Sequence, residues 1–173
     1  MIPIGISEIL KAVDGTLLWG DENGVVTNVV TDSRKAGKGS LFVPIVGERV
    51  DAHRFIPQVM QAGAGVTFSS RKDVAPAALG CCIYVEDTLA ALQKAAAYYR
   101  SRFDIPVIGV TGSVGKTTTK EMISAVLEKK YRVVKTQGNW NSQIGVAMMM
   151  FELEPETELA IFEMGMSLPG EMA

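Results

Sequence analysis

The chain has 173 residues, of which 47% are hydrophobic and 21% are charged, and its formal net charge is -2. This composition supports a packed core rather than disorder, and the small net charge argues against nucleic-acid binding by bulk electrostatics. No stretch approaches the roughly 18 apolar residues of a membrane-spanning helix, and the amino terminus lacks the basic segment of a secretory signal. We therefore expect a cytoplasmic protein with neither a membrane nor a nucleic acid as partner.

The only two cysteines, Cys81 and Cys82, are adjacent and precede an apolar stretch. Adjacent cysteines make a poor disulfide, and a pair with no histidine nearby makes a poor zinc site. The pair is therefore expected to be two reduced, inert core thiols, which suits a reducing compartment.

The first hundred residues alternate short apolar runs with turn signals, which predicts alternating strands and helices and an α/β fold. Strands are expected at residues 25–31, 41–46, 66–68 and 82–85. Helices are expected at residues 6–13, with Ser7 as a plausible cap, at 53–63, with Gly63 as its stop, and at 88–103, with Asp87 or Thr88 as its cap.

A domain boundary is predicted near residues 104–106, because Pro106 cannot continue the preceding helix. We expect a small first domain at 1–104 and the first part of a phosphate-loop domain with a parallel sheet at 105–173. Its expected strands are 107–110, 132–135 and 159–162, and its expected helices are 116–130 and 143–151. A further helix is predicted to start near residues 169–171. Since a three-stranded parallel sheet with an unfinished crossover is an unusual end for a domain, the chain is interpreted as part of a longer protein.

A glycine-rich segment joins the first strand and first helix of this second domain: Thr111-Gly112-Ser113-Val114-Gly115-Lys116-Thr117-Thr118. Glycines let several backbone N–H groups converge on one anion, and the start of the helix adds its positive dipole end. Lys116 can reach the β- and γ-phosphates of a nucleotide, and the Thr117 hydroxyl can bind magnesium. Val110 occupies the place of the first glycine of the full P-loop pattern, so the match is to the shorter Gly-x-x-Gly-Lys-Thr form. Its setting between a strand and a helix favours a phosphate loop over a glycine turn with a solvated lysine.

Glu163 follows the predicted strand 159–162. Ligands of open parallel sheets bind at the carboxyl ends of the strands. An acid at this edge can hold a metal ion that is bound to phosphate, although an ordinary strand-end carboxylate is the alternative. The neighbouring phosphate loop favours a catalytic, metal-binding Glu163.

Several segments, in order, resemble the Mur ligase family. In the second domain they are the phosphate loop with its continuation to Glu121, Thr136-Gln137-Gly138-Asn139-Trp140-Asn141-Ser142-Gln143-Ile144-Gly145-Val146, and Glu163-Met164-Gly165-Met166-Ser167 with Gly170-Glu171. In the first domain they are Thr31-Asp32-Ser33-Arg34, Gly39-Ser40-Leu41-Phe42-Val43-Pro44, Gly47-Glu48 and Asp51-Ala52-His53-Arg54-Phe55-Ile56. The resemblance covers nearly the whole chain, which makes it more specific than the loop alone.

The resemblance implies a three-domain, ATP-dependent amide ligase of peptidoglycan precursor synthesis. It is greatest to the branch that joins D-alanyl-D-alanine to UDP-N-acetylmuramoyl tripeptide through an acyl phosphate. ATP and Mg²⁺ are the implied cofactors, and the reaction demands that charge be neutralised at the transferred phosphate. Lys116, Thr117 with one magnesium ion, and Glu163 with a second magnesium ion would supply that neutralisation, so Thr117 and Glu163 are the expected metal ligands.

The family's amino-terminal domain holds the UDP group. By this resemblance, the candidate residues of a UDP pocket are Ser33, Arg34, Asp51 and His53. Arg34 could contact the pyrophosphate, whereas Asn139 and Asn141 could hydrogen-bond substrate or phosphate oxygens. His53, the only histidine, has the alternative of a helix-start residue without a ligand, and Asp32 and Ser33 have the alternative of turn or cap residues.

Other functions stay open at this point. A ligase branch that adds the third amino acid shares the loop, but Ser113 and the run Thr117-Thr118-Thr119-Lys120-Glu121 favour the D-alanyl-D-alanine branch. The chain could also be a non-catalytic nucleotide-binding module that is complete at Ala173, or a structural α/β protein with vestigial motifs. The family's later metal-binding histidine, modified lysine and carboxy-terminal domain would lie beyond Ala173, so this chain alone is expected to be inactive. We expect a monomer.

Overall fold

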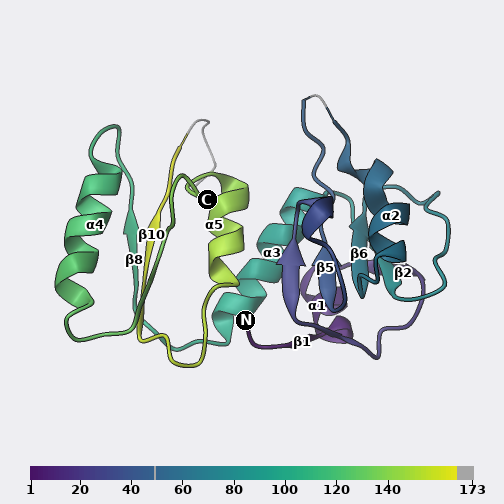
Figure 1. Ribbon diagram of the computed structural model, residues 1–173, viewed down its shortest axis with the longest axis horizontal. Coiled ribbons are helices and arrows are strands. Elements are labelled where there is room, and N and C mark those ends of the chain that lie inside the picture. The colour runs from purple at the N-terminus through teal and green to yellow at the C-terminus, as the bar shows by residue number, and fades with distance from the viewer. Residues whose placement is uncertain (49, 167–173) are drawn as a thin grey trace. The chain divides into compact units, whose positions relative to one another are not determined.

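The computed structural model describes residues 1–48 and 50–166 and is shown in Figure 1. Two compact units are present, one over Met1–Tyr98 and one from Tyr99 onwards. Both are α/β structures, as expected. Within the described ranges, no helix is long and apolar enough to cross a membrane.

The first unit is built on a five-stranded sheet in the order β2-β7-β6-β5-β4. Its strands are β2 (Thr16–Trp19), β4 (Asn28–Val30), β5 (Ser40–Phe42), β6 (Val66–Ser69) and β7 (Cys81–Tyr84). Neighbouring strands from β4 to β7 are parallel, whereas β2 pairs with β7 in the antiparallel direction at one edge. Two short strands, β1 (Ile4–Gly5) and β3 (Val25–Val26), form a separate antiparallel pair.

Helices and 3₁₀ turns cover this sheet. They are α1 (Ile6–Ala12), the turns η1 (Ser33–Lys35) and η2 (Ala52–Phe55), α2 (Ile56–Gln61) and α3 (Thr88–Ser101). Ile56, Val59 and Met60 of α2 pack on Val30 and Phe42 of the sheet. Burial of these side chains is the main stabilising term of such a layer.

The two cysteines of β7 belong to the same core. Cys81 and Cys82 are fully buried and unpaired. Burial raises the pKa of Cys81 to about 11 and that of Cys82 to about 12. Both thiols are therefore protonated at neutral pH, which makes them the inert core thiols that were expected.

The first unit differs from expectation in several places: β1 was not predicted, β5 ends at Phe42, and the helix expected at 53–63 begins as the turn η2. The stretch 25–31 forms two strands because Val25–Val26 pairs with β1 whereas Asn28–Val30 pairs with β5. Ser7 is not a cap: Gly5 precedes α1, and its N–H donates to the Glu8 carboxylate at 2.7 Å. The edge strand β2 was not predicted at all. By contrast, Asp87 caps α3 by accepting from two backbone N–H groups at 2.7 and 2.9 Å.

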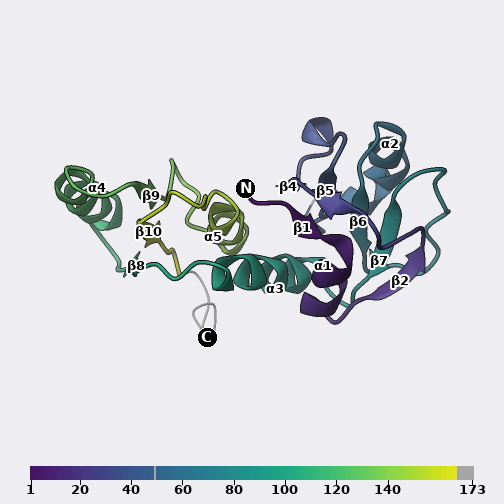
Figure 2. The ribbon, with the colours of Figure 1, turned by 90° about the horizontal axis from the view of Figure 1, so that it is seen from below.

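The second unit contains a parallel sheet in the order β8-β10-β9. Its elements are β8 (Val107–Val110), α4 (Lys116–Leu127), β9 (Val133–Lys135), α5 (Gln143–Met150) and β10 (Leu159–Glu163). Figures 1 and 2 show the sheet between α4 and α5. The central strand β10 is buried along its whole length, which explains its unbroken apolar sequence before Glu163. The helix expected near residues 169–171 lies outside the described residues.

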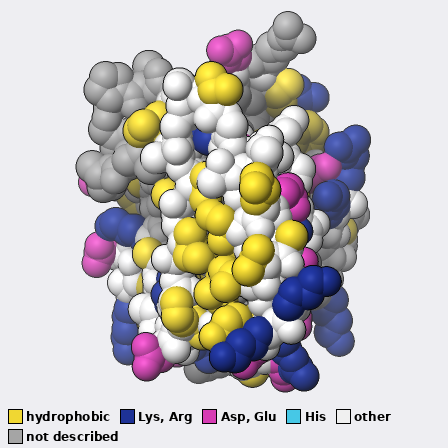
Figure 3. Space-filling view, turned by 90° about the vertical axis from the view of Figure 1, so that its left-hand side faces the viewer, with side chains coloured by type: hydrophobic (Ala, Val, Ile, Leu, Met, Phe, Trp, Pro, Cys, Tyr) yellow, Lys and Arg dark blue, Asp and Glu magenta, His cyan; other side chains and the backbone are white. Residues whose placement is uncertain are grey.

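Helix α4 is apolar on two sides. Its inner side packs Ile123 and Leu127 against Val110 and Ile161 of the sheet. Its outer side carries Met122 and Val126, which are 67% and 71% exposed, and apolar side chains gather on this face in Figure 3. An ordinary surface helix has one apolar stripe, so α4 departs from that pattern.

Candidate functional site

The segment between β8 and α4 is the candidate phosphate loop. Gly112 and Gly115 have φ values of 146° and 78°, a backbone region that favours glycine. Gly115 directly precedes α4, so the free N–H groups of the first helical turn face the loop. The Thr111 hydroxyl donates to the Met164 carbonyl oxygen at 2.9 Å, which ties the loop to the segment after β10. The loop therefore has the strand–loop–helix setting that anion binding requires.

Lys116 is the first residue of α4 and is half-buried. Its Nζ atom donates to the carbonyl oxygen of Gly112 at 2.7 Å, so the side chain folds back across the loop. An ionised phosphate oxygen is a stronger acceptor than a carbonyl oxygen. The ammonium group is thus held beside the loop by a bond that a phosphate can replace.

The carboxylate of Glu163 is the centre of the site. Glu163 ends β10, is 2% exposed, and lies directly beside Val110 at the end of β8. The Thr117 hydroxyl lies 3.1 and 3.0 Å from its two carboxylate oxygens, and Asn141 Nδ2 donates to Oε1 at 3.0 Å. The structure therefore brings together three of the predicted residues from three separate segments of the chain.

Asn141 lies in the connection between β9 and α5, which is fixed by several backbone contacts. Gly165 N donates to the Asn141 carbonyl oxygen at 2.8 Å, and the Ser142 hydroxyl caps α5 by accepting from Gly145 N at 3.2 Å. A Cβ atom at Gly145 would lie only 2.6 Å from the carbonyl carbon of Trp140, so the helix approaches this connection as closely as a glycine allows. Asn139 is exposed in the same connection, and its contact with a ligand stays a prediction.

The oxygen donors of Thr117 and Glu163 fit a magnesium ion, which prefers hydroxyl, carboxylate and phosphate oxygens. No group of three or more His, Cys, Asp or Glu side chains with metal-binding geometry occurs among residues 1–48 and 50–166. Such a group is not needed, because Mg²⁺ bound to a nucleotide takes most of its ligands from phosphate and water. Thr117 and Glu163 are the two side chains that would hold the ion.

In the first unit, Asp51 and His53 form one hydrogen-bonded group. His53 is 6% exposed, and its Nε2 atom accepts from Ser70 N at 3.0 Å, so Nδ1 carries the proton and donates to Asp51 Oδ1 at 2.6 Å. Arg71 pairs with the other Asp51 oxygen. Burial raises the pKa of Asp51, but hydrogen bonds from His53 and the positive charge of Arg71 outweigh it and lower the pKa overall. Both ring nitrogens of His53 thus have protein partners.

Ser70 and Arg71 were not predicted to join this group. The sequence signal that could have indicated them is polar residues directly after the buried strand β6, the same signal that indicated Glu163 after β10.

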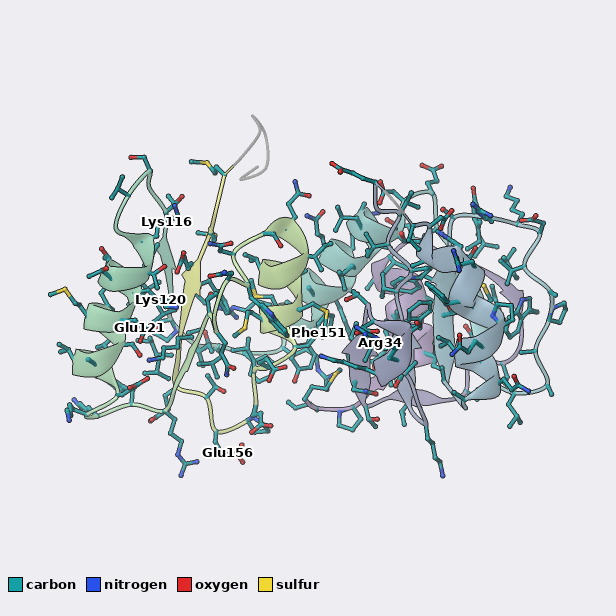
Figure 4. The ribbon with its side chains drawn as sticks, turned by 45° about the horizontal axis from the view of Figure 1, so that its top comes forward. Arg34, Lys116, Lys120, Glu121, Phe151 and Glu156 are labelled. Carbon is teal, nitrogen blue, oxygen red and sulfur yellow. The ribbon has the colours of Figure 1, made fainter. Side chains whose placement is uncertain are left out.

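Ser33 and Arg34 lie in the turn η1. Asp32 caps this turn by accepting from Arg34 N at 3.0 Å, which confirms the capping alternative for Asp32. Arg34 Nη2 also pairs with Asp32 at 2.6 Å, and this hydrogen bonding lowers the pKa of Asp32 to about 2. The Arg34 side chain is 85% exposed and is labelled in Figure 4. The contacts of these residues with UDP stay predictions.

The fold and this geometry define a class: an α/β protein with a phosphate loop and an acidic residue at the carboxyl edge of a parallel sheet, as in nucleotide-binding enzymes. Two family models match the chain, the Mur ligase family catalytic domain over residues 25–100 and the Mur ligase middle domain over residues 110–173. The chain belongs to the Mur ligase family.

Several curated relatives of the chain carry the name UDP-N-acetylmuramoyl-tripeptide--D-alanyl-D-alanine ligase. The Bacillus subtilis protein is 44% identical over 173 residues, which are 99% of this chain and 38% of the relative. The Synechocystis protein is 47% identical over 148 residues, 86% of this chain and 33% of the relative. The chain therefore spans little more than a third of the length of these relatives.

Solved structures of ligases also match this chain over about a third of their own length. The Acinetobacter baumannii UDP-N-acetylmuramoylalanyl-D-glutamyl-2,6-diaminopimelate--D-alanyl-D-alanyl ligase has a TM-score of 0.89 and 35% identity, and covers 98% of this chain and 38% of its own. The Thermotoga maritima MurF ligase in complex with ADP has a TM-score of 0.76 and 33% identity, and the match covers 84% of this chain and 33% of the Thermotoga chain. A UDP-N-acetylmuramoyl-L-alanyl-D-glutamate--2,6-diaminopimelate ligase shares the fold, with a TM-score of 0.64 and 16% identity over 94% of this chain and 36% of its own.

Proposed function

We propose that this chain forms the UDP-substrate-binding and phosphate-binding part of an ATP-dependent amide ligase. The whole enzyme would join D-alanyl-D-alanine to UDP-N-acetylmuramoyl tripeptide, the reaction for which the curated relatives are named. One observation carries the proposal: a phosphate loop and the group of Thr117, Asn141 and Glu163 lie at the same end of one parallel sheet. This edge is where such folds bind their ligands.

Each residue has a separate task in the proposed reaction. The N–H groups of the loop and Lys116 hold the β- and γ-phosphates of ATP, so that the γ-phosphorus faces the substrate carboxylate. Thr117 and Glu163 would hold Mg²⁺, which would neutralise charge on the phosphate oxygens. Asn141 orients the Glu163 carboxylate through its hydrogen bond of 3.0 Å. Asn139 would donate to a substrate or phosphate oxygen.

The proposed chemistry has two steps. A carboxylate oxygen of the UDP-linked peptide attacks the γ-phosphorus, and the bond from the γ-phosphorus to the β-phosphate oxygen breaks. ADP departs, and the peptide carboxylate has become an acyl phosphate. The amine of D-alanyl-D-alanine then attacks the acyl carbon, and the tetrahedral intermediate loses phosphate and a proton to give the amide. Both steps build negative charge next to the loop, where the Lys116 ammonium and the helix dipole of α4 stabilise it.

In the first unit, we infer that Arg34 contacts the pyrophosphate of the UDP group with its exposed guanidinium. Ser33 would donate its hydroxyl, and Asp51 and His53 would shape the pocket wall through their mutual hydrogen bonds. The substrates assign the reaction to the cytoplasm, where ATP and UDP-linked precursors occur. The protein would act as a monomer, with neither a nucleic acid nor a membrane as partner.

The test is isothermal titration calorimetry with UDP-N-acetylmuramoyl tripeptide and with Mg-ATP. We expect both to bind, and we expect Lys116→Ala to weaken Mg-ATP binding about 100-fold, the effect of losing a charged hydrogen-bond donor. Lys129→Ala, at an exposed lysine after α4, is the matched control and should leave the affinity unchanged. Mg-ATP binding without binding of the UDP compound would favour a nucleotide-binding module, and binding of neither to the folded chain would refute the ligase proposal.

A further inference from the structure

Lys120 is a lysine in the interior of the second unit that was not among the predicted site residues. It lies on α4 one turn after Lys116, and it is only 1% exposed. Figure 4 shows Lys116 and Lys120 on the side of α4 that faces β10. A lysine is almost never fully buried unless its ammonium group is paired. The partners of Lys120 therefore indicate its role.

The Lys120 ammonium group has three oxygen partners. Its Nζ atom donates to the Thr136 carbonyl oxygen at 2.7 Å. It also forms ion pairs with Glu121 Oε1 at 3.1 Å and with Glu163 Oε2 at 3.7 Å. One hydrogen bond and two ion pairs converge on this ammonium group, so the side chain is held in one orientation.

Thr136 connects the same ammonium group to the backbone of Glu163. Thr136 directly follows β9 and is 1% exposed. Its hydroxyl accepts from Glu163 N at 2.8 Å, and its own N–H donates to the Ile161 carbonyl oxygen at 3.0 Å. Lys120 thus reaches Glu163 in two ways, by charge at the carboxylate and through Thr136 at the backbone.

We propose that Lys120 is the positioning residue of this site, which holds the Glu163 carboxylate in place for a magnesium–nucleotide complex bound with Thr117. The inference rests on the proposed function. At 3.7 Å the Lys120–Glu163 contact is longer than a hydrogen bond, so Lys120 supplies a counter-charge while Thr117 and Asn141 make the hydrogen bonds. Lys120 is buried behind the carboxylate and does not itself bind phosphate, which separates its role from that of Lys116.

A double-mutant cycle on nucleotide binding tests this role. Wild type, Lys120→Met, Glu163→Gln and the double variant are titrated with ADP by calorimetry, once with Mg²⁺ and once with EDTA. Lys120→Met should lower the Mg-ADP affinity about tenfold in the wild-type background, within the range of coupling between contacting residues, and should have less than about a twofold effect in the Glu163→Gln background. The affinity for ADP in EDTA should not change in either variant.

Lys135→Met is the matched control. Lys135 also pairs with Glu121, at 2.8 Å, and with Glu128, at 3.2 Å, but it belongs to the strand β9 and is partly exposed. If Lys120 mattered only for holding α4 to β9, the two lysine variants would have similar effects. We expect Lys135→Met to bind Mg-ADP like wild type.

An equal loss of Mg-ADP affinity from Lys120→Met in both backgrounds overturns the inference, because a packing role is independent of Glu163. No loss of affinity in either background overturns it as well, because Lys120 would then have no effect on the site. If Lys120→Met does not fold by circular dichroism, Lys120→Gln takes its place, since it keeps a donor for Thr136 and removes the charge. A wild-type chain that binds no ADP refutes the proposed function separately. Urea unfolding of the same four proteins then decides the inference, and additive losses of stability would exclude any coupling between Lys120 and Glu163.

Discussion

Each unit of the chain contains one carboxylate that gathers several donors, and the two carboxylates differ in where their partners come from. Asp51 is bonded by His53, two residues further along, and by Arg71, 20 residues away, and its side chain is 28% exposed. Glu163 is 2% exposed, and Thr117 and Asn141 lie 46 and 22 residues away from it. A local partner is typical of a capped turn, whereas distant partners meet only once the sheet has formed. The bond to His53 therefore caps the turn of Asp51, to which Arg71 adds one distant partner. The hydrogen-bond partners of the Glu163 carboxylate are both distant, so Glu163 marks a site that the whole fold assembles.

The largest expected effect would come from breaking the Asp51 group. His53→Ala should lower the free energy of unfolding by about 3 kcal/mol, because it leaves the half-buried Ser70 N–H without its acceptor and creates a cavity at the buried His53 position. Urea denaturation followed by circular dichroism measures the loss. Arg54→Ala, at the exposed neighbouring residue, should cost less than about 1 kcal/mol. A His53→Ala protein that is as stable as wild type would contradict the structural role of this group.

Next in size is the effect of breaking the Glu163 group, which should appear in binding rather than in stability. Glu163→Gln should lower the gain in ADP affinity that Mg²⁺ provides by about tenfold or more, because an amide oxygen is a weaker ligand than a carboxylate. Calorimetry with Mg²⁺ and with EDTA gives this ratio. Glu156→Gln, at an exposed glutamate before β10, is the control and should keep the full magnesium response. An unchanged ratio in Glu163→Gln would remove Glu163 from the metal site.

A smaller loss of ligand affinity is expected from substitution of Arg34 in the first unit. Arg34→Ala should weaken binding of UDP-N-acetylmuramoyl tripeptide about fivefold while the unfolding midpoint stays the same, since an exposed ion pair contributes little stability. Lys35→Ala removes an adjacent exposed charge and should not alter the affinity beyond experimental error. Equal losses in the two variants would indicate general electrostatic attraction instead of a contact with the pyrophosphate.

The smallest effect is a change in one titration. Hydrogen bonds from the Arg34 side chain and backbone lower the pKa of Asp32 from 3.8 to about 2. Because the folded-state pKa is depressed, the stabilising contribution of this pair is present above pH 3.8 and is lost as the pH falls towards 2. Arg34→Ala should move the pKa of Asp32 back towards 3.8, as measured by the carboxyl carbon shift in an NMR titration. A titration midpoint that does not move would show that the backbone bond alone sets it.

The sequence predicted the elements of the second unit more accurately than those of the first. β8 and the first residue of α4 lie where they were expected, because a short apolar run ends at a glycine loop, although β8 is an edge strand in which only Val110 is buried. β2 was missed because it is partly exposed and gains its strand conformation by pairing with β7 far along the chain. The two short strands within 25–31 were not separable either, since their different partners are a property of the fold.

For the site, residue type and chain position were enough to indicate Lys116, Thr117 and Glu163 as one group. The structure brings Thr117 and Glu163 within hydrogen-bonding distance. Lys120 could not be found in this way, because a lysine on a helix is usually exposed and only the tertiary partners reveal that it is buried. Ser70 was missed for a similar reason, since its bond to His53 joins residues that are 17 positions apart.

Gly145 has a consequence for anyone who reads mutant alleles of this gene. It carries no functional group, yet an added methyl group would lie 2.6 Å from the Trp140 carbonyl carbon. Relief of that clash would displace the connection that carries Asn141 away from Glu163. A serine or alanine at residue 145 would then weaken Mg-ADP binding in the same way as a lesion of the nucleotide site. Extra magnesium would distinguish the residue 145 variant from a variant that lacks Thr117 or Glu163. It should restore binding in the residue 145 variant, because the Glu163 carboxylate and the Thr117 hydroxyl are both still present.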